Sequence, residues 1–220
     1  MSTKRNENAH GPLPETLFGR TLADYSGFRF SKLNDPRFSH LKLIAGWIVY
    51  FTLYFLTENL IPESSCHVVR CALDDLIPFQ EFFVIFYCSW FVLIFGYLLF
   101  YLLYDTRRFA QLQSFIMITQ FVAMAVYIFW PSVQLLRPEV FPRNNFFTWV
   151  LSIIYAFDTP TGVTPSLHVA YSLGVVSVCL KDGRASRWWK AFVVVLVIII
   201  SLSTAFIKQH SVVEIGRAHV

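Results

Sequence analysis

The sequence has few charged residues, and this shortage excludes a soluble domain. Asp, Glu, Lys and Arg make up 15% of the 220 residues, whereas soluble domains contain about 25%. Hydrophobic residues make up 55% of the chain, and the mean hydropathy is +0.52. Such a chain cannot cover a water-facing surface with polar groups, so we expect an integral membrane protein. The formal net charge of +4 is too small to indicate a nucleic-acid partner.

The sequence also lacks a metal-binding cysteine pattern and a cluster of carboxylates. The four cysteines, Cys66, Cys71, Cys88 and Cys179, do not have the spacing of a metal site. We therefore expect no metal and no cofactor. Cys66 and Cys71 share one predicted loop, where a disulfide and two free thiols are both compatible with the sequence.

The first 40 residues lack the apolar run that a secretory signal places directly behind a short basic start. We predict that residues 1–40 form a cytoplasmic N-terminal arm. Aromatic residues such as Phe18 and Phe28 would let part of this arm lie on the bilayer surface, but we favour a loosely ordered arm.

Long apolar segments follow, and they predict an all-α fold. A helix needs about 20 apolar residues to cross a bilayer, and only a helix satisfies its own backbone there. We expect a polytopic membrane helix bundle over residues 41–213, with a short interfacial or re-entrant helix at Phe146–Phe157. The five predicted spans are Leu43–Ile61, Phe82–Tyr104, Leu112–Trp130, Leu167–Leu180 and Ala191–Ile207.

Lys and Arg residues orient these spans. Thirteen of the eighteen fall in the N-terminal arm or in loops on the same side of the predicted bundle. Because such residues concentrate on the cytoplasmic side, we place the N-terminus in the cytoplasm. Segments 62–80 and 131–166, and the residues after Ile207, then lie on the extracytoplasmic side.

Two histidines lie at the extracytoplasmic ends of predicted spans. His168 begins the fourth span, and His210 follows the fifth, four residues before Glu214. Residues four apart on a helix are neighbours, so Glu214 can reach His210 and fix its tautomer. A neutral imidazole held in this way is a competent nucleophile for phosphoryl transfer. His168 could protonate the departing oxygen as general acid.

Three further residues could bind a phosphate at the same end. Arg137 and Lys208 would neutralise its non-bridging oxygens. Ser166 stands at a helix start, where backbone N–H groups would face the phosphate. Cations near an interface also serve as snorkelling anchors, and this interpretation stays open for Lys208. Asp158 is expected to be a turn or cap residue.

The segment Thr164–His168 resembles the central Pro-Ser-x-His motif of the type 2 phosphatidic acid phosphatase superfamily. The chain is similar to its lipid phosphatase and inositol phosphorylceramide synthase-like branch over roughly residues 80–213. Arg137 and Pro138 match the end of the first motif of the family, but Trp130 stands where a Lys is expected. The resemblance implies that His168 is the general acid and that Arg137 binds the phosphate.

The third motif of the family is matched in part. Ser203 and His210 agree with it, whereas Thr204 and Glu214 replace an Arg and an Asp. The resemblance implies that His210 is the nucleophile, that residue 214 is its orienting carboxylate, and that Lys208 supplies a phosphate-binding cation in place of the missing Arg.

The family fold continues with a sixth span after the third motif, and this chain does not. Residues 214–220 are short and polar, and they match the translation of a widely used sequencing adapter in one reading frame. We therefore interpret the transmembrane domain, 41–213, as C-terminally truncated and incomplete. Whether residues 214–220 are a non-native tail stays open.

The sequence thus predicts a membrane-bound lipid phosphate phosphatase or phosphotransferase that acts through a phosphohistidine at the extracytoplasmic face. Its partners would be a lipid phosphate substrate and membrane lipids, without nucleic acid, and its oligomeric state is open. Water, a lipid hydroxyl and a polyol hydroxyl are all compatible acceptors. The alternative is a non-catalytic membrane protein, such as a transporter subunit or scaffold with a decayed site, which Trp130 and Thr204 favour.

Overall fold

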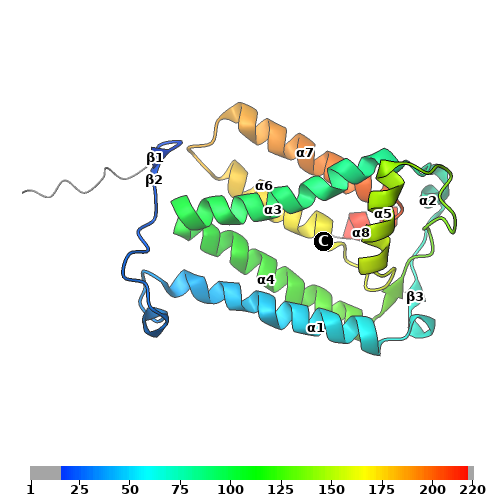
Figure 1. Ribbon diagram of the computed structural model, residues 1–220, viewed down its shortest axis with the longest axis horizontal. Helices are drawn as coiled ribbons and strands as arrows, with labels where there is room; N and C mark the ends of the chain where they lie inside the picture. The colour runs from blue at the N-terminus through cyan, green and yellow to red at the C-terminus, as the bar shows by residue number, and fades with distance from the viewer. Residues whose placement is uncertain (1–15, 218–220) are drawn as a thin grey trace, which may run out of the picture.

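Five helices lie along the longest axis of the molecule (Figure 1). The computed structural model describes residues 16–217, most of which are helical. The five are α1 (Gly46–Leu60), α3 (Val84–Tyr104), α4 (Thr106–Phe129), α6 (Leu167–Leu180) and α7 (Arg187–Phe206).

Short elements complete the two ends of this bundle (Figure 1). The arm end, where the chain enters, carries the antiparallel strands β1 (Thr16–Leu17) and β2 (Arg20–Thr21) and the 3-10 turns η1 (Phe30–Lys32) and η2 (Ser39–Ala45). The opposite end, called the distal end below, carries α2 (Ala72–Leu76), α5 (Phe146–Phe157), α8 (Val212–Arg217), the turns η3 (Glu63–Ser65) and η4 (Glu81–Phe83), and the parallel strands β3 (His67–Val68) and β4 (Ser132–Val133).

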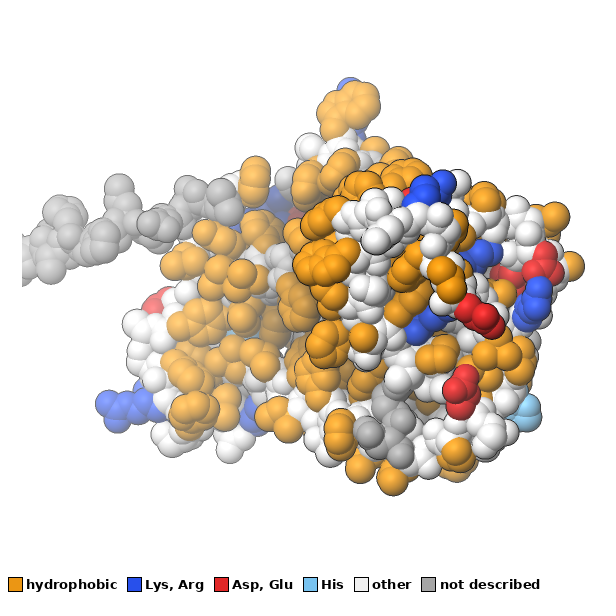
Figure 2. All heavy atoms as spheres, turned by 45° about the vertical axis from the view of Figure 1, so that its right-hand side comes forward, with side chains coloured by type: hydrophobic (Ala, Val, Ile, Leu, Met, Phe, Trp, Pro, Cys, Tyr) orange, Lys and Arg blue, Asp and Glu red, His pale blue; other side chains and the backbone are white. Residues whose placement is uncertain are grey.

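Four helical segments are long and apolar enough to cross a membrane: Ser39–Thr57, Glu81–Tyr104, Thr106–Phe129 and Arg187–Phe206. They overlap four of the five predicted spans, and they indicate a membrane protein. Figure 2 shows apolar side chains over much of the face of the molecule that it displays. These apolar side chains are exposed on the surface of the protein. Contact with water would be unfavourable for them, whereas contact with lipid is favourable.

The remaining predicted span, the fourth, corresponds to α6 and is shorter than the others, so five spans are not confirmed. It has 14 residues, which gives a length of about 21 Å. It packs against α3, α4 and α7, and Gly174 lets α4 approach closely, since a Cβ there would lie 2.5 Å from the ring of Phe115. Because protein surrounds α6, irregular backbone next to this short helix can lie within the membrane without exposing its polar groups to lipid.

The described part of the N-terminal arm packs against the bundle, and this differs from the loosely ordered arm that we predicted. Arg20 is 3% exposed and pairs with Asp105 at 2.7 Å and with Asp182. The Ala23 N–H donates to the Leu103 carbonyl at 2.7 Å. Composition gave no sign of this docking, because the two carboxylates lie 85 and 162 residues from Arg20.

Candidate active site

Two histidines from different elements meet at the distal end. His168 is the second residue of α6, and His210 lies in the turn between α7 and α8. The distance from His168 Nδ1 to His210 Nε2 is 3.4 Å, and the ring centroids are 5.6 Å apart. The predicted convergence of these two imidazoles is therefore confirmed.

Glu214 contacts His210 as the spacing of four residues predicts. Its Oε2 lies 2.6 Å from His210 Nδ1, and its side chain is completely buried. Burial raises the pKa of the Glu214 carboxyl, and the hydrogen bond from His210 opposes this rise. A carboxylate accepts from Nδ1–H, so the lone pair of His210 lies on Nε2 and faces an N–H of His168. A nucleophilic nitrogen thus lies beside a proton donor.

A left-handed turn at the end of α7 positions His210. The Gln209 N–H donates to the Thr204 carbonyl, and the Lys208 N–H donates to the Ala205 carbonyl. This pair of bonds is the Schellman arrangement that ends many helices. Lys208 occupies its left-handed position with φ +56°, where glycine is usual because a Cβ costs about 1 kcal/mol there.

Asp74 of α2 fixes the segment that follows His210, and the sequence analysis missed it. Its carboxylate accepts from Ser211 Oγ at 2.7 Å and from the Val212 N–H at 2.8 Å. Burial alone would raise the pKa of Asp74, but these hydrogen bonds lower it below its ordinary value on balance. Because 137 residues separate Asp74 from Ser211, no local pattern could have indicated this contact.

Two aromatic residues of α3 confine the ring of His168. The ring centroids of Tyr87 and Trp90 lie 4.6 and 4.5 Å from that of His168. Trp90 Nε1 also donates to the His168 carbonyl at 3.0 Å. The imidazole is therefore held between two rings, with its Nδ1 toward His210.

A cavity of about 490 Å³ reaches both histidines. Its walls come from α1, α3, α5, α6 and the segment 158–163. Its polar end contains His168, His210, Asp158 and Gln209, with Thr159 and Thr161 next to Asp158 in the sequence. Pockets that are largely apolar with a few converging polar groups are typical ligand sites, and this one suits an amphiphile. The aromatic wall residues on α1 and α3 are Trp47, Tyr50, Phe51, Tyr54, Tyr87, Trp90, Phe91 and Phe95.

Arg137 lies beside the loop that forms one wall of the cavity. Its guanidinium donates to the carbonyls of Tyr155 at 3.4 Å and Thr159 at 3.2 Å, and it lies 4.4 Å from the centroid of the Tyr155 ring. Its Nε is buried without a hydrogen-bond partner among the described residues. Burial lowers the pKa of Arg137, and the nearby Asp158 opposes this shift. Because Thr159 lines the cavity, the guanidinium is next to the site with donor capacity left.

The structure places Lys208 differently from the prediction. Its Nζ donates to the carbonyls of Asp74 at 2.7 Å and Ile77 at 2.6 Å. The side chain does not line the cavity, and burial lowers the pKa of its ammonium. Lys208 therefore ties the α7–α8 turn to the end of α2, where backbone carbonyls would otherwise be unpaired.

Ser166 is the N-cap residue of α6 and is completely buried. Its Oγ has no hydrogen-bond partner in the part of the chain that the structure describes. It does not line the cavity, so the predicted phosphate contact would require the ligand to reach past His168.

Trp130 and Thr204 stand where the family motifs have a Lys and an Arg, and neither side chain supplies a positive charge. Trp130 is 39% exposed and stacks on His67, with ring centroids 5.1 Å apart. Thr204 is completely buried, and its Oγ1 donates to the Ser201 carbonyl at 2.8 Å. Arg137 is therefore the member of the predicted clamp that lies nearest to the cavity wall.

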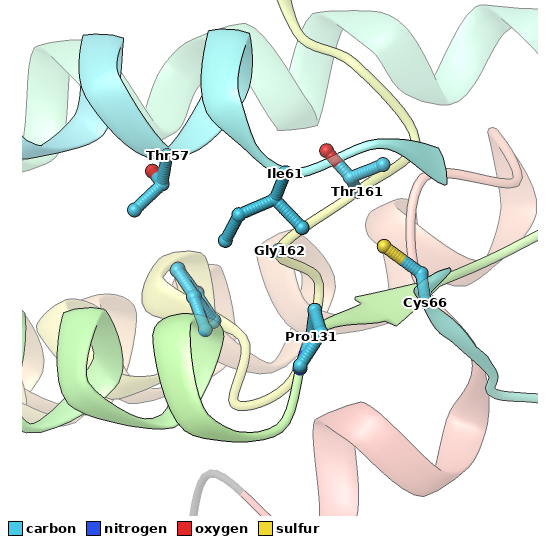
Figure 3. Close-up of a pocket in the computed structure, with 7 residues that line it drawn as sticks. Thr57, Ile61, Cys66, Pro131, Thr161 and Gly162 are labelled. Atoms are coloured by element: carbon cyan, nitrogen blue, oxygen red, sulfur yellow. The ribbon is translucent and has the colours of Figure 1, made fainter. Parts of the chain in front are cut away.

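A second, much smaller pocket lies beside the end of α1. Figure 3 shows Ile61 and Cys66 near Thr161 of the loop that precedes α6. Its volume of about 10 Å³ leaves room for about one water molecule. No disulfide joins Cys66 to Cys71 in the described part of the chain, which agrees with the unbonded alternative.

Asp158 and Gln209 are members of the site that the sequence analysis did not assign to it. Asp158 is the C-cap residue of α5, in agreement with the expected turn or cap role, and it also lines the cavity. Gln209 directly precedes His210 in the sequence, and this adjacency was the available signal. Within residues 16–217, no group of His, Cys, Asp and Glu side chains is arranged to hold a metal ion.

Comparisons of the chain with protein families, with curated proteins and with solved structures found no match.

Proposed function

We propose that this protein is a membrane-bound lipid phosphate phosphatase or phosphotransferase that works through a phosphohistidine on His210. The observation that carries the proposal is the hydrogen-bonded series Glu214–His210–His168 at the polar end of an aromatic cavity. The site would face the extracytoplasmic side, as the distribution of Lys and Arg indicates.

In the first half-reaction, His210 Nε2 would attack phosphorus. The N–P bond forms as the ester P–O bond breaks, and His168 gives its proton to the departing oxygen. Glu214 stabilises the positive charge that develops on the His210 ring, as the carboxylate of a catalytic triad does. In the second half-reaction an acceptor oxygen attacks phosphorus, the N–P bond to His210 breaks, and the proton of the acceptor passes to His168.

The phosphate must enter between the two imidazoles. The rings touch at 3.4 Å when nothing lies between them, so binding would separate them, and catalytic contacts often become well aligned only in the complex. Arg137 would turn part of its donor set from the Tyr155 and Thr159 carbonyls toward the non-bridging oxygens.

The cavity supports a lipid as the carrier of the phosphate. Its aromatic walls on α1 and α3 suit hydrocarbon chains, and its polar end suits a head group. A site at the end of spanning helices lets the tails stay in the bilayer while the head group reacts.

Substitution of the histidines tests this proposal. His210→Ala should reduce phosphate release from phosphatidic acid by at least about a thousandfold, and His168→Ala should slow substrates with poor leaving groups most. His67→Ala is the matched control, because His67 stacks on Trp130 and does not line the cavity. Full activity of His210→Ala would refute the proposed nucleophile.

A non-catalytic membrane protein is the second candidate. The engagement of Lys208 with α2 and the absence of a cation at Trp130 and Thr204 favour it. Incubation of the purified protein with phosphatidic acid in excess chelator separates the two, since a metal-free histidine enzyme should still turn over. Absence of phosphate release and of transfer under these conditions would favour the non-catalytic protein.

A further inference from the structure

We propose that residues 28–32 of the N-terminal arm, called the arm turn below, dock on the cytoplasmic leaflet of the membrane. Phe30 would insert its ring among the acyl chains, and Arg29 and Lys32 would bind anionic phospholipid head groups. This inference goes beyond the proposed function and does not depend on it, because the arm turn lies at the arm end and the two histidines lie at the distal end.

The arm turn is fixed to the bundle by a series of aromatic rings. The ring centroids of Phe30 and Phe28 are 5.7 Å apart, and those of Phe28 and Phe38 are 5.4 Å apart. Phe38 is 2% exposed and also contacts Tyr25, whose Oη donates to the Leu102 carbonyl at 2.6 Å. Because the turn is already ordered, it would lose little conformational entropy when it binds a surface.

Phe30 lies at the exposed tip of this series. Its side chain is 84% exposed, and the Lys32 N–H donates to the Arg29 carbonyl at 2.8 Å to close the turn. Arg29 and Lys32 are exposed on either side of it. Neither cation forms an ion pair with a carboxylate in residues 16–217. An exposed ring between two unpaired cations suits a membrane surface that offers both hydrocarbon and negative charge.

Exposed rings recur at the arm end, and this distinguishes Phe30 from an isolated surface residue, which would need no explanation. Phe18, between β1 and β2, is 77% exposed, and Trp188 at the start of α7 is 73% exposed. The guanidinium of Arg187 lies 5.3 Å from the centroid of the Trp188 ring. Aromatic rings with neighbouring cations are typical of the boundary between lipid and water.

The arm turn lies where the chain approaches the bilayer. The first membrane-length segment, Ser39–Thr57, begins shortly after Lys32, and Figure 1 shows the arm crossing the end of the bundle from β2 to the start of α1. The distribution of Lys and Arg indicates that this end faces the cytoplasm. The leaflet there contains anionic lipids, and their field extends about 8–10 Å from the surface.

The net charge of the arm favours a bilayer over a protein groove as the occupant. Four exposed cations outnumber two exposed carboxylates around the turn: Arg29, Lys32, Arg37 and Lys42 against Asp24 and Asp35. Arg37 pairs with Asp24, so the field around the turn stays positive. An anionic bilayer complements both this field and the ring of Phe30, whereas an apolar groove would match the ring alone.

Hydrogen exchange of the arm turn tests the proposal. The full-length protein is placed in nanodiscs of phosphatidylcholine and in nanodiscs that also contain phosphatidylserine, and exchange of the amides of residues 28–32 is followed by mass spectrometry. Exchange should be slower by at least about fivefold in the presence of phosphatidylserine. High salt should remove most of this difference, because it screens the attraction.

Variants separate the charges from the ring. Arg29→Ala combined with Lys32→Ala should reduce the difference between the two nanodiscs to within about twofold, whereas Arg29→Lys should preserve it, because a head-group layer attracts charge without requiring the planar guanidinium. Phe30→Ser should remove the protection, and Phe30→Leu should retain most of it. Arg70→Ala is the matched control, because it removes an exposed cation at the distal end, and it should have no effect.

A fluorescence measurement tests insertion of the ring directly. Phe30→Trp adds one fluorophore to the six native tryptophans, and the emission of the wild-type protein is subtracted. Bromine atoms on the acyl chains of phosphatidylserine should quench the added emission, and iodide in the water should not. Quenching by iodide alone, equal exchange in the two kinds of nanodisc, or protection that survives Phe30→Ser would overturn the proposal.

Discussion

The two ends of the helix bundle differ in how completely their buried polar groups are hydrogen-bonded. At the arm end they satisfy one another, since Arg20 pairs with Asp105 and Asp182, and Tyr101 Oη donates to Asp182 at 3.1 Å. At the distal end several buried polar atoms have no partner within residues 16–217. These are Gln134 Nε2, Arg137 Nε, Thr164 Oγ1, Ser166 Oγ, Gln209 Oε1 and Glu214 Oε1.

This difference is the one we expect between a structural cluster and the proposed ligand site. A buried polar atom without a partner costs about 1–3 kcal/mol, and native structures contain few of them. Two of these atoms belong to Gln209 in the cavity wall and to Glu214, the partner of His210, which is consistent with partners that arrive with a substrate. Substitutions at the arm end should therefore change stability, and substitutions at the distal end should change activity first.

After His210→Ala, the largest effect is expected at Glu214. Glu214→Gln keeps the size of the side chain but allows His210 to adopt the other tautomer, so phosphate release should fall by at least about a hundredfold. Glu214→Asp keeps the charge and should retain activity within about tenfold. Steady-state rates on phosphatidic acid check both. Equal losses in the two variants would show that shape rather than charge matters at this position.

The arm end provides the contrasting experiment. Arg20→Ala removes the buried cation that pairs with Asp105 and Asp182 and leaves them only Arg108, so the free energy of unfolding should fall by about 2 kcal/mol. Arg29→Ala changes an exposed arginine of the same arm and should have an effect within about 0.5 kcal/mol. Unfolding in detergent measures both, and the rate per folded molecule should stay the same. If Arg20→Ala instead lowered the rate of phosphate release per folded molecule, the arm end could not be regarded as purely structural.

Substitution of Asp74 should lower both the stability and the activity of the protein, because Asp74 anchors the segment that follows His210. Asp74→Ala removes the acceptor of Ser211 and Val212 and should destabilise the protein by about 2 kcal/mol. Asp75→Ala serves as the control on the same helix. Thermal unfolding and phosphate release should both respond to Asp74→Ala and neither to Asp75→Ala.

The sign of the pH effect at Asp74 follows from its lowered pKa. A carboxyl whose pKa is lower in the folded state contributes stability that is complete above its unfolded value, about 3.8. This contribution is lost as the pH falls through the folded pKa. The difference in stability between wild type and Asp74→Ala should therefore shrink below about pH 4, which unfolding at a series of pH values measures.

The smallest predicted effect concerns the turn before His210. Both Lys208→Gly and Lys208→Ala remove the hydrogen bonds from Lys208 Nζ to the end of α2. Glycine adopts the left-handed conformation at this position without strain, whereas alanine keeps the strain. The glycine variant should be the more stable by about 1 kcal/mol. Equal unfolding temperatures would argue against strain at this position.

Local patterns predicted much of the fold and part of the site. Apolar run length predicted the four long helices, and the spacing of His210 and Glu214 predicted their contact, since both depend on neighbouring residues. The contacts of Arg20 and Asp74 join distant segments and leave no local trace. Lys208 was assigned to the phosphate because its charge is visible in the sequence, whereas the left-handed turn that directs it to α2 is not.

One consequence follows from the position of α1. This helix supplies Trp47, Tyr50, Phe51 and Tyr54 to the cavity, yet only 6% of the Ser39–Thr57 segment is buried within the chain. Packing against α4 holds one side of this wall, and surrounding acyl chains would cover the other. The thickness and saturation of the host bilayer should thus tune how tightly substrate is bound, and a detergent micelle should yield a different KM from a native-like membrane.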